Sequence, residues 1–387
     1  MESRISLAED SVLDPEISPG AEAKITRLSE ASSVLITGTT GFLGSFLLDH
    51  LLRATGRDTR FYCLVRDRDL GQDKSSNRVL ETLEFYSLDS QSADERVIPI
   101  LGDLTRPRMG LDNGQYQRLS EEIDLIFHCA ASVNYTYPYT TAKPHTVGGT
   151  LEALRFACTA TPKPVQYISS NGVFPGGDDS PYLENNQIDD FIDRMEGGYN
   201  QAKWVAERLV WSAVSRGLPV CIYRPGNIGH HSRTGTVNPN DFLSLIIRAC
   251  ARLARAPQAP DWFFEMTPVD FLVNAIARIA DAPKHFGRVY NIVQQDPVPA
   301  DRIFARMESN GHVTGRVTLK DWKSRLQAAA DRGDQDLKVL VLSLDSVEPY
   351  LADTSAYDIS KFTGALSGIG LTMPAVDADY ATMFLKE

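Results

Sequence analysis

Short runs of apolar residues alternate with longer amphipathic segments over the first 226 residues of the chain. Six runs have the length and composition of buried strands, at residues 34–37, 61–65, 97–101, 125–129, 165–169 and 219–223. A helical pattern follows the first run over about residues 41–54 and stops at Gly56. Continuous apolar strands separated by helical segments are typical of a parallel sheet covered on both faces. The pattern therefore predicts a doubly wound α/β fold.

The pattern changes after Arg224-Pro225-Gly226. Helical patterns then predominate, at residues 243–253, 272–279, 322–330 and 375–385, and one run at 289–293 could still return a strand to the sheet. No internal repeat or low-complexity tract interrupts the chain. We therefore predict three parts, which are a polar linker or tail over residues 1–32, an α/β domain over residues 33–226, and a smaller, mainly helical lobe over residues 227–387.

Composition narrows the class of protein. The 387 residues carry a net charge of −11, which disfavours nucleic-acid binding because phosphate contacts need clustered Lys and Arg. No apolar run reaches the roughly 18–20 residues that span a bilayer, and the N-terminus has no signal-peptide core, so we expect a cytoplasmic protein with no membrane partner. The five cysteines form no CxxC pair, and His230 and His231 are adjacent instead of being at ligand spacing, so we expect reduced thiols and no metal site.

A glycine-rich turn follows the first predicted strand and opens the first helix. Glycine allows the backbone to approach a pyrophosphate, and the free N–H groups of the helix terminus bind it. A glycine triplet alone is a weak signal, but here the strand before it and the helix after it have the order that a dinucleotide site requires. We expect the cofactor to be bound by Gly38, Thr40, Gly41, Phe42, Leu43 and Gly44.

The end of the second strand selects between cofactors. An NAD site usually places a carboxylate there for the ribose 2′-hydroxyl, whereas an arginine accommodates a 2′-phosphate. Arg66 occupies this end and Arg68 lies nearby, which favours NADPH. Asp67 keeps NADH from being excluded, and the alternative for Arg66 is a solvated loop charge.

Residues after the next two strands complete the predicted cofactor site. Asp103 and Leu104 are placed to reach the adenine, and the small Ala130 and Ala131 lie where the cofactor crosses the sheet edge. Residues 33–226 thus form an NADP-binding Rossmann domain, which leaves the lobe over 227–387 to bind the substrate.

Tyr199 and Lys203 form a YxxxK pair, which the four-residue spacing places on one face of a helix. A phenol with a pKa of about 10 becomes an acid–base group only when a neighbouring cation stabilises its phenolate, which Lys203 can do while holding the nicotinamide ribose. Ser170, at the end of the fifth strand, is our choice for the hydroxyl that binds the substrate carbonyl, with Ser169 as the runner-up. Such a pair also occurs by chance, but its place between the fifth and sixth strands makes it specific.

Together these motifs resemble the extended short-chain dehydrogenase/reductase family. More narrowly, they resemble the terminal thioester reductase domains of nonribosomal peptide synthetases, hybrid polyketide synthases and carboxylic acid reductases. The narrower resemblance covers about residues 30–330 and rests on residues 34–44, 62–66, 102–104, 128–134, 223–228, 267–271 and 319–322. It implies that Pro225, Asn227 and Ile228 also contact the cofactor. One departure is Thr146, where the family usually has an asparagine, although Thr146 can still form a hydrogen bond.

The resemblance implies hydride transfer from NADPH to an acyl or peptidyl thioester on a phosphopantetheinylated carrier protein, with release of an aldehyde or, after a second transfer, an alcohol. Ser170 and Tyr199 would stabilise and protonate the oxyanion. Three alternatives stay open, which are redox-independent Dieckmann cyclisation, a ketone reductase or epimerase acting on a free small molecule, and an NADP-sensing regulatory protein. The intact glycine turn and the Tyr199–Lys203 pair favour a reductase. The sequence leaves the acyl group open.

Overall fold

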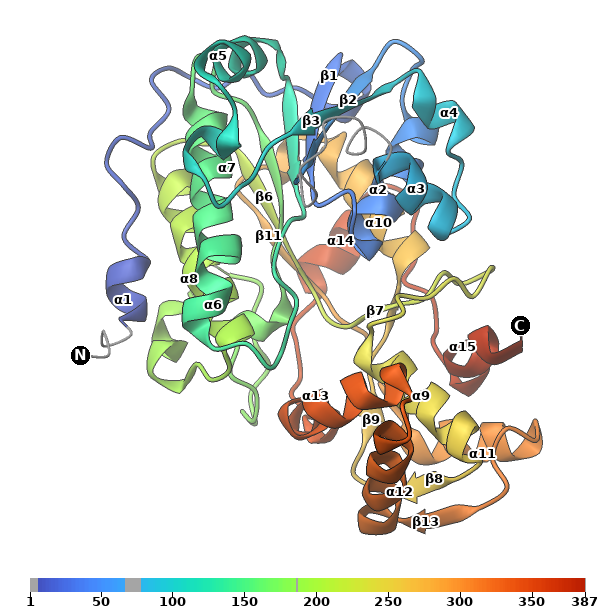
Figure 1. Ribbon diagram of the computed structural model, residues 1–387. Coiled ribbons are helices and arrows are strands. Elements are labelled where there is room, and N and C mark those ends of the chain that lie inside the picture. The colour runs from blue at the N-terminus through green and yellow to red at the C-terminus, as the bar shows by residue number, and fades with distance from the viewer. Residues whose placement is uncertain (1–5, 67–77, 186, 387) are drawn as a thin grey trace.

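A seven-stranded parallel sheet forms the centre of the computed structural model, which describes residues 6–66, 78–185 and 187–386 (Figure 1). Its strand order is β11-β6-β5-β4-β1-β2-β3. The strands are β1 (Ser33–Thr37), β2 (Arg60–Val65), β3 (Val97–Leu101), β4 (Leu125–His128), β5 (Val165–Ile168), β6 (Val220–Pro225) and β11 (Val289–Ile292). The predicted doubly wound α/β fold is confirmed.

The strand order reverses at β1, which pairs with β2 on one side and with β4 on the other. Leu35 in β1 stands in register with Tyr62 in β2 and with Ile126 in β4. In sheets of this kind, ligands bind beyond the carboxyl ends of the strands at the point of reversal. The segments that follow β1 and β4 are therefore placed at a binding edge.

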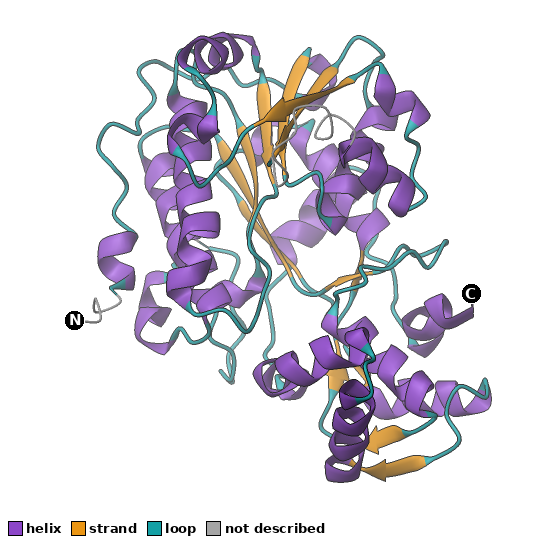
Figure 2. Cartoon of the chain, in the orientation of Figure 1, coloured by secondary structure: helices purple, strands orange, loops and turns teal. Residues whose placement is uncertain are grey.

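Helices cover both faces of the sheet (Figures 1 and 2). One face buries α5 (Asn113–Glu122), α6 (Tyr139–Lys143), α7 (Gly149–Cys158) and α8 (Gly198–Ser215). The other face buries α2 (Phe42–Ala54), α3 (Arg78–Phe85), α10 (Val269–Ala280) and α14 (Ser360–Gly368), while the short α4 (Gln91–Asp94) precedes β3. Leu35 packs into the first core, and its neighbours Val34 and Ile36 pack into the second, as the two-residue period of a strand requires.

A separate hydrophobic core forms the C-terminal lobe. Its elements are α9 (Phe242–Leu253), β8 (Ala256–Gln258), β9 (Phe263–Phe264), β12 (Val298–Pro299), α11 (Ala300–Ser309), β13 (Arg316–Thr318), α12 (Leu319–Asp331), α13 (Gln335–Ala352) and α15 (Ala378–Thr382). Two short strands, β7 (Ile228–Gly229) and β10 (Thr267–Pro268), pair between the lobe and the sheet. The last predicted helix starts later than expected, because the Asp377 carboxylate caps it by accepting from Tyr380 N.

The chain after residue 227 contributes to both parts of the molecule. α10 and α14 pack in the core of the sheet, and β11 extends the sheet beside β6, so these three elements lie outside the lobe. The boundary at residue 226 therefore marks a change in the sequence pattern, but residues on its C-terminal side belong partly to the sheet domain and partly to the lobe. Among the described residues, no helix combines the length and apolar character needed to cross a bilayer.

The N-terminal segment, predicted as a linker or tail, packs against the sheet domain from residue 6 onward. Leu13 and Ile17 are 2% and 0% exposed and belong to the first core. Arg216 at the end of α8 donates hydrogen bonds to the carbonyls of Leu13, Asp14 and Ile17. The first helix, α1 (Leu7–Asp10), is anchored by Tyr139 Oη, which donates to an Asp10 carboxylate oxygen at 2.7 Å. A few apolar anchors thus hold a segment whose composition is polar.

Candidate active site

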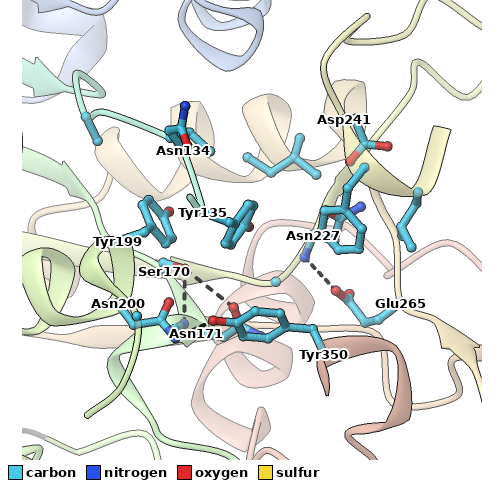
Figure 3. Close-up of a pocket in the computed structure, with 18 of the residues that line it drawn as sticks. Asn134, Tyr135, Ser170, Asn171, Tyr199, Asn200, Asn227, Asp241, Glu265 and Tyr350 are labelled. Carbon is cyan, nitrogen blue, oxygen red and sulfur yellow. Dashed lines mark hydrogen bonds between the residues drawn. The ribbon is translucent and has the colours of Figure 1, made fainter. Parts of the chain in front are cut away.

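A cleft of about 1680 Å³ opens between the carboxyl ends of the strands and the C-terminal lobe. Pockets for one small ligand usually measure about 300–1,000 Å³, so this cleft has room for a dinucleotide and a substrate together. Its wall includes the glycine turn after β1 at one end and residues of α9 and α13 at the other. Ser170 and Tyr199 also line the cleft, and Figure 3 shows them beside Tyr135 and Asn200.

The glycine turn forms a cradle that only glycine fits. Gly38 has a φ of +82°, and a Cβ there would lie 2.9 Å from Ala130 N. A Cβ on Gly44 would lie 2.1 Å from Gly38 O, so the helix could not pack this close to the strand. The helix α2 begins after Gly41 with no side-chain cap, which leaves its first N–H groups free for a phosphate. All six residues predicted in this turn line the cleft, and the cradle fits a dinucleotide.

Two arginines line the cleft beyond β2. Arg66 is exposed, and its carbonyl accepts a 2.6 Å hydrogen bond from Arg78 Nη1. Arg78 is not among the residues expected from the sequence, although its position at the start of α3, the helix after β2, is a signal that could have indicated it. The predicted Arg68 lies outside the described residues. Asp103 also lies here: partial burial opposes ionisation, but hydrogen bonds from Thr105 and the Arg66 charge together lower its pKa.

Most of the other predicted cofactor residues line the same cleft, namely Leu104, Ala130, Ala131, Asn227 and Ile228. Pro225 does not line it, because it is the buried last residue of β6 and pairs with Ile292 in β11. Lys203 is also outside the wall and only 3% exposed. The assignment of these residues to cofactor binding stays a prediction.

Tyr199 and Ser170 both line the cleft, and the Ser170 side chain is close enough to the Tyr199 phenol to influence its pKa. Burial raises the pKa of Tyr199, and the Ser170 hydroxyl opposes this shift. Tyr199 is therefore a protonated phenol at neutral pH and can act as an acid. The Ser170 hydroxyl is held in place by the Gly172 N–H, which donates to its oxygen at 3.0 Å.

The neighbouring Ser169 points elsewhere. Its hydroxyl donates to Glu207 Oε2 at 2.5 Å, and Ser169 does not line the cleft. Of the two serines at the end of β5, Ser170 is thus the one that a substrate in the cleft can reach.

Lys203 lies one helical turn after Tyr199 and anchors α8 to the sheet. Its ammonium donates to Ile168 O at 2.7 Å and lies 5.2 Å from the centre of the Tyr167 ring. Burial lowers the pKa of Lys203 to about 8, while Glu207 acts in the opposite direction. The roles predicted for Lys203, in stabilising the Tyr199 phenolate and in holding the nicotinamide ribose, stay predictions.

A buried ion pair continues the same face of α8. Glu207 is 0% exposed, and both its carboxylate oxygens accept from Arg224 Nε on β6, at 3.0 and 3.1 Å. Trp211, a further turn along, donates to Glu207 Oε1 at 3.1 Å. This network fixes α8 against the segments of β5 and β6. The sequence analysis missed Glu207, whose four-residue spacing from Lys203 was the available signal.

Thr146, the residue that departs from the family pattern, supports the loop after β4. It lies in a π-helical turn (Pro144–Gly148), and its hydroxyl accepts from Ser132 N at 3.2 Å. Thr150 Oγ1 in turn donates to Thr146 O at 2.8 Å. Thr146 thus uses its hydrogen-bonding capacity to position the loop that contains Ala130 and Ala131.

Four aromatic rings of the cleft wall meet, and we call them the aromatic cluster: Tyr135, Tyr199, Phe242 and Tyr350. The Tyr135 ring is central, with centroid distances of 5.3 Å to Tyr199, 5.6 Å to Tyr350 and 5.8 Å to Phe242. Phe242 comes from α9 and Tyr350 from α13, so the lobe completes a wall that begins on the loop after β4 (Figure 3).

The Rossmann sheet, the glycine cradle and the Ser170–Tyr199 pair define a nicotinamide-dependent oxidoreductase. Residues 36–276 match the model of an NAD-binding family described as male sterility protein. The chain belongs to this family and is a reductase of the kind found in nonribosomal peptide synthetases and polyketide synthases.

Three relatives illustrate the similarity. The crystal structure of the terminal R domain from the myxalamid PKS-NRPS biosynthetic pathway has a TM-score of 0.87 and 38% identity, over 98% of this chain and 95% of that one. Glycine betaine reductase ATRR of Emericella nidulans is 38% identical over 82% of this chain. The non-canonical nonribosomal peptide synthetase hkm10 of Aspergillus hancockii is 32% identical over 83% of it. The chain spans only 25% and 31% of the lengths of these last two proteins.

Proposed function

We propose that this chain uses NADPH to reduce an acyl or peptidyl thioester on a phosphopantetheinylated carrier protein, and so releases an aldehyde. The observation that carries the proposal is the position of the Ser170–Tyr199 pair. Both residues line one continuous cleft, whose wall also includes the glycine cradle and residues of the lobe. The names of the relatives support it, because they include a terminal R domain and a nonribosomal peptide synthetase.

The preference for NADPH rests on Arg66 and Arg78. They are the only Lys or Arg residues that line the described part of the cleft, and they lie beyond β2, where a 2′-phosphate would be bound. A guanidinium offers a planar pair of donors to phosphate oxygens. Two guanidinium groups at this point favour the phosphorylated cofactor.

Two residues of the chain would bind and protonate the oxygen of the thioester carbonyl. A bound NADPH supplies the hydride that the carbonyl carbon accepts. Ser170 and Tyr199 donate hydrogen bonds to the carbonyl oxygen as its negative charge develops, and Tyr199 transfers its proton to that oxygen. The resulting hemithioacetal then expels the carrier thiol and leaves the aldehyde. The raised pKa of Tyr199 suits this role, because it keeps the phenol protonated before the reaction.

The test is incubation of the chain and NADPH with an acyl thioester on its phosphopantetheine carrier, followed by product mass and NADPH oxidation. We expect an aldehyde or alcohol, and a kcat/KM well above that for the same acyl group on a short thiol, because remote contacts are used in the transition state. Tyr199→Phe should lower kcat by roughly 10²–10⁴-fold while NADPH still binds.

Three outcomes would contradict the proposal in different ways. A cyclised product formed without NADPH oxidation would indicate Dieckmann release. Activity on free ketones alone would indicate a small-molecule reductase, and cofactor binding without turnover of any substrate would indicate a sensor.

A further inference from the structure

The two halves of the cleft differ in charge. Beyond the glycine cradle, the lining contains Arg66 and Arg78. On the side of the catalytic hydroxyls and the lobe, no described lining residue is Lys or Arg, and the carboxylates are Asp178, Asp179, Glu196, Asp241, Glu265, Asp345 and Asp353. His145 is the one described histidine of the lining. An anionic acyl group would meet repulsion in this half.

Some of these carboxylates already have partners. Asp178 pairs with Arg194 at 2.8 Å, and Asp345 lies 3.4 Å from Lys323 at the outer rim, where its side chain is 93% exposed. The Glu265 oxygens accept from Asn227 N at 2.6 Å and Gln294 N at 2.9 Å, but burial outweighs these hydrogen bonds and raises the pKa of Glu265 to about 7, so it carries only part of a negative charge at neutral pH. Asp241 differs from these carboxylates, because it lines the cleft at the start of α9.

Asp241 combines a capping role with a position in the cleft. Its Oδ2 caps α9, accepting from Ser244 N at 2.8 Å and from Ser244 Oγ at 2.7 Å. Burial raises the pKa of Asp241, while the hydrogen bonds from Ser244, the Asn227 side chain and the Arg248 charge act in the opposite direction. The Arg248 guanidinium itself donates to Pro239 O. Asp241 still adds a negative charge to the half of the cleft that holds the catalytic hydroxyls (Figure 3).

The aromatic cluster supplies a second, independent feature. Phe242 directly follows Asp241, and the Asp241 charge acts on Tyr135, whose ring is central to the cluster. The faces of aromatic rings carry partial negative charge and attract cations, most strongly where water is excluded. The rings of the aromatic cluster and the Asp241 carboxylate line the same cleft. Aromatic faces combined with a carboxylate can bind an ammonium group.

On the basis of the proposed function, we infer that the acyl group of the substrate carries a positively charged nitrogen close to its thioester carbonyl. Tyr199 belongs both to the catalytic pair and to the aromatic cluster, so the rings begin beside the reacting carbonyl. The nitrogen therefore lies within a few bonds of that carbon. Asp241, Tyr135, Phe242 and Tyr350 are the specificity-determining residues of this site.

The test compares two pantetheine thioesters of the same shape, N,N,N-trimethylglycyl and 3,3-dimethylbutanoyl, which differ in a cationic nitrogen against a neutral carbon. We expect wild type to favour the cation by about tenfold or more in kcat/KM. The ammonium group also withdraws electrons and so makes the carbonyl more reactive, but this effect belongs to the substrate and is the same for every variant. The decisive quantity is therefore how much a substitution changes the ratio of kcat/KM for the cationic thioester to kcat/KM for the neutral one.

Asp241→Asn retains an oxygen that can cap α9, so the helix is preserved while the charge is lost. We expect it to lower the ratio by at least about fivefold, and Phe242→Leu to lower it as well. Asp345→Asn, at the exposed rim, is the matched control and should leave the ratio unchanged.

A wild type that reduces the neutral thioester as well as the cationic one would overturn the inference. An unchanged ratio in Asp241→Asn would overturn it too, and both results would leave thioester reduction standing. If neither thioester is reduced while NADPH binds, the proposed function itself fails, and the inference fails with it.

Discussion

The side-chain amide of Asn200 donates a 2.8 Å hydrogen bond to the hydroxyl of Tyr350. Asn200 directly follows Tyr199 in α8, and Tyr350 lies near the end of α13 in the lobe. A Cβ on Gly172 would lie only 2.4 Å from Asn200 Oδ1, so the glycine beside the Ser170 loop makes room for this amide. One contact thus joins the lobe to the helix that carries Tyr199, beside the loop that carries Ser170.

Replacing Tyr350 with Phe removes this hydroxyl and keeps the ring. The Asn200 amide is then left without its partner, which costs about 1 kcal/mol and loosens the attachment of the lobe. We expect kcat to fall roughly fivefold while the Kd for NADPH is unchanged, as measured by steady-state kinetics and cofactor titration. Tyr137→Phe, at a cleft tyrosine that is 43% exposed, is the control and should change neither. An unaffected kcat in Tyr350→Phe would show that the contact is incidental.

Arg66→Ala and Arg78→Ala should each weaken the binding of NADPH far more than that of NADH. A charge-assisted hydrogen bond to phosphate contributes on the order of 1.5–3 kcal/mol, or about ten- to a hundredfold in affinity. Fluorescence titration of both cofactors measures the difference. Arg27→Ala offers a matched loss of charge at a side chain that is 52% exposed, pairs with Glu30 and lies outside the cleft wall, so it should leave both affinities unchanged. Equal losses for the two cofactors would remove these arginines from 2′-phosphate recognition.

The sequence predicts the sheet well because its strands are buried on both faces. Each apolar run stands alone between turn residues, and the glycine turn after β1 needs only local chemistry to be recognised. Ser170 and Tyr199, which the sequence indicates from a strand end and a helical spacing, both line the cleft, while their catalytic roles stay predictions. Features that depend on a few local residues are therefore readable from the sequence.

The contributions that the sequence did not reveal depend on contacts between distant segments. Tyr350 reaches α8 across 150 residues of sequence, and Arg78 approaches Arg66 only once α3 has folded back beside β2. α10 has an ordinary amphipathic pattern, and nothing in that pattern says whether it covers the sheet or the lobe. Packing alone decides this, because either core could bury its apolar face.

Lys203 leads to a prediction about pH. Burial lowers its pKa to about 8, so its ammonium loses a proton as the pH rises through about 8. If Lys203 holds the nicotinamide ribose, the Kd for NADPH should increase roughly fivefold between about pH 7 and pH 9.5, as a charged hydrogen bond becomes a neutral one. Lys203→Met should bind more weakly at the lower pH and lose this dependence. A wild-type Kd that is flat over this range would place Lys203 outside the cofactor site.

The buried pair of Glu207 and Arg224 leads to a prediction about stability. Both side chains are 0% exposed, so Glu207→Gln leaves the Arg224 guanidinium charged and without a counter-ion in the core. We expect a loss of about 3–5 kcal/mol in the free energy of unfolding, measured by urea denaturation. Asp336→Asn breaks a pair with Arg252 in which the two side chains are 45% and 43% exposed, and it should cost no more than about 1 kcal/mol. Replacing Glu207 and Arg224 together with Met should recover part of the loss, because no unpaired charge then remains. If Glu207→Gln costs no more than the surface control, the pair does not hold α8 against β6.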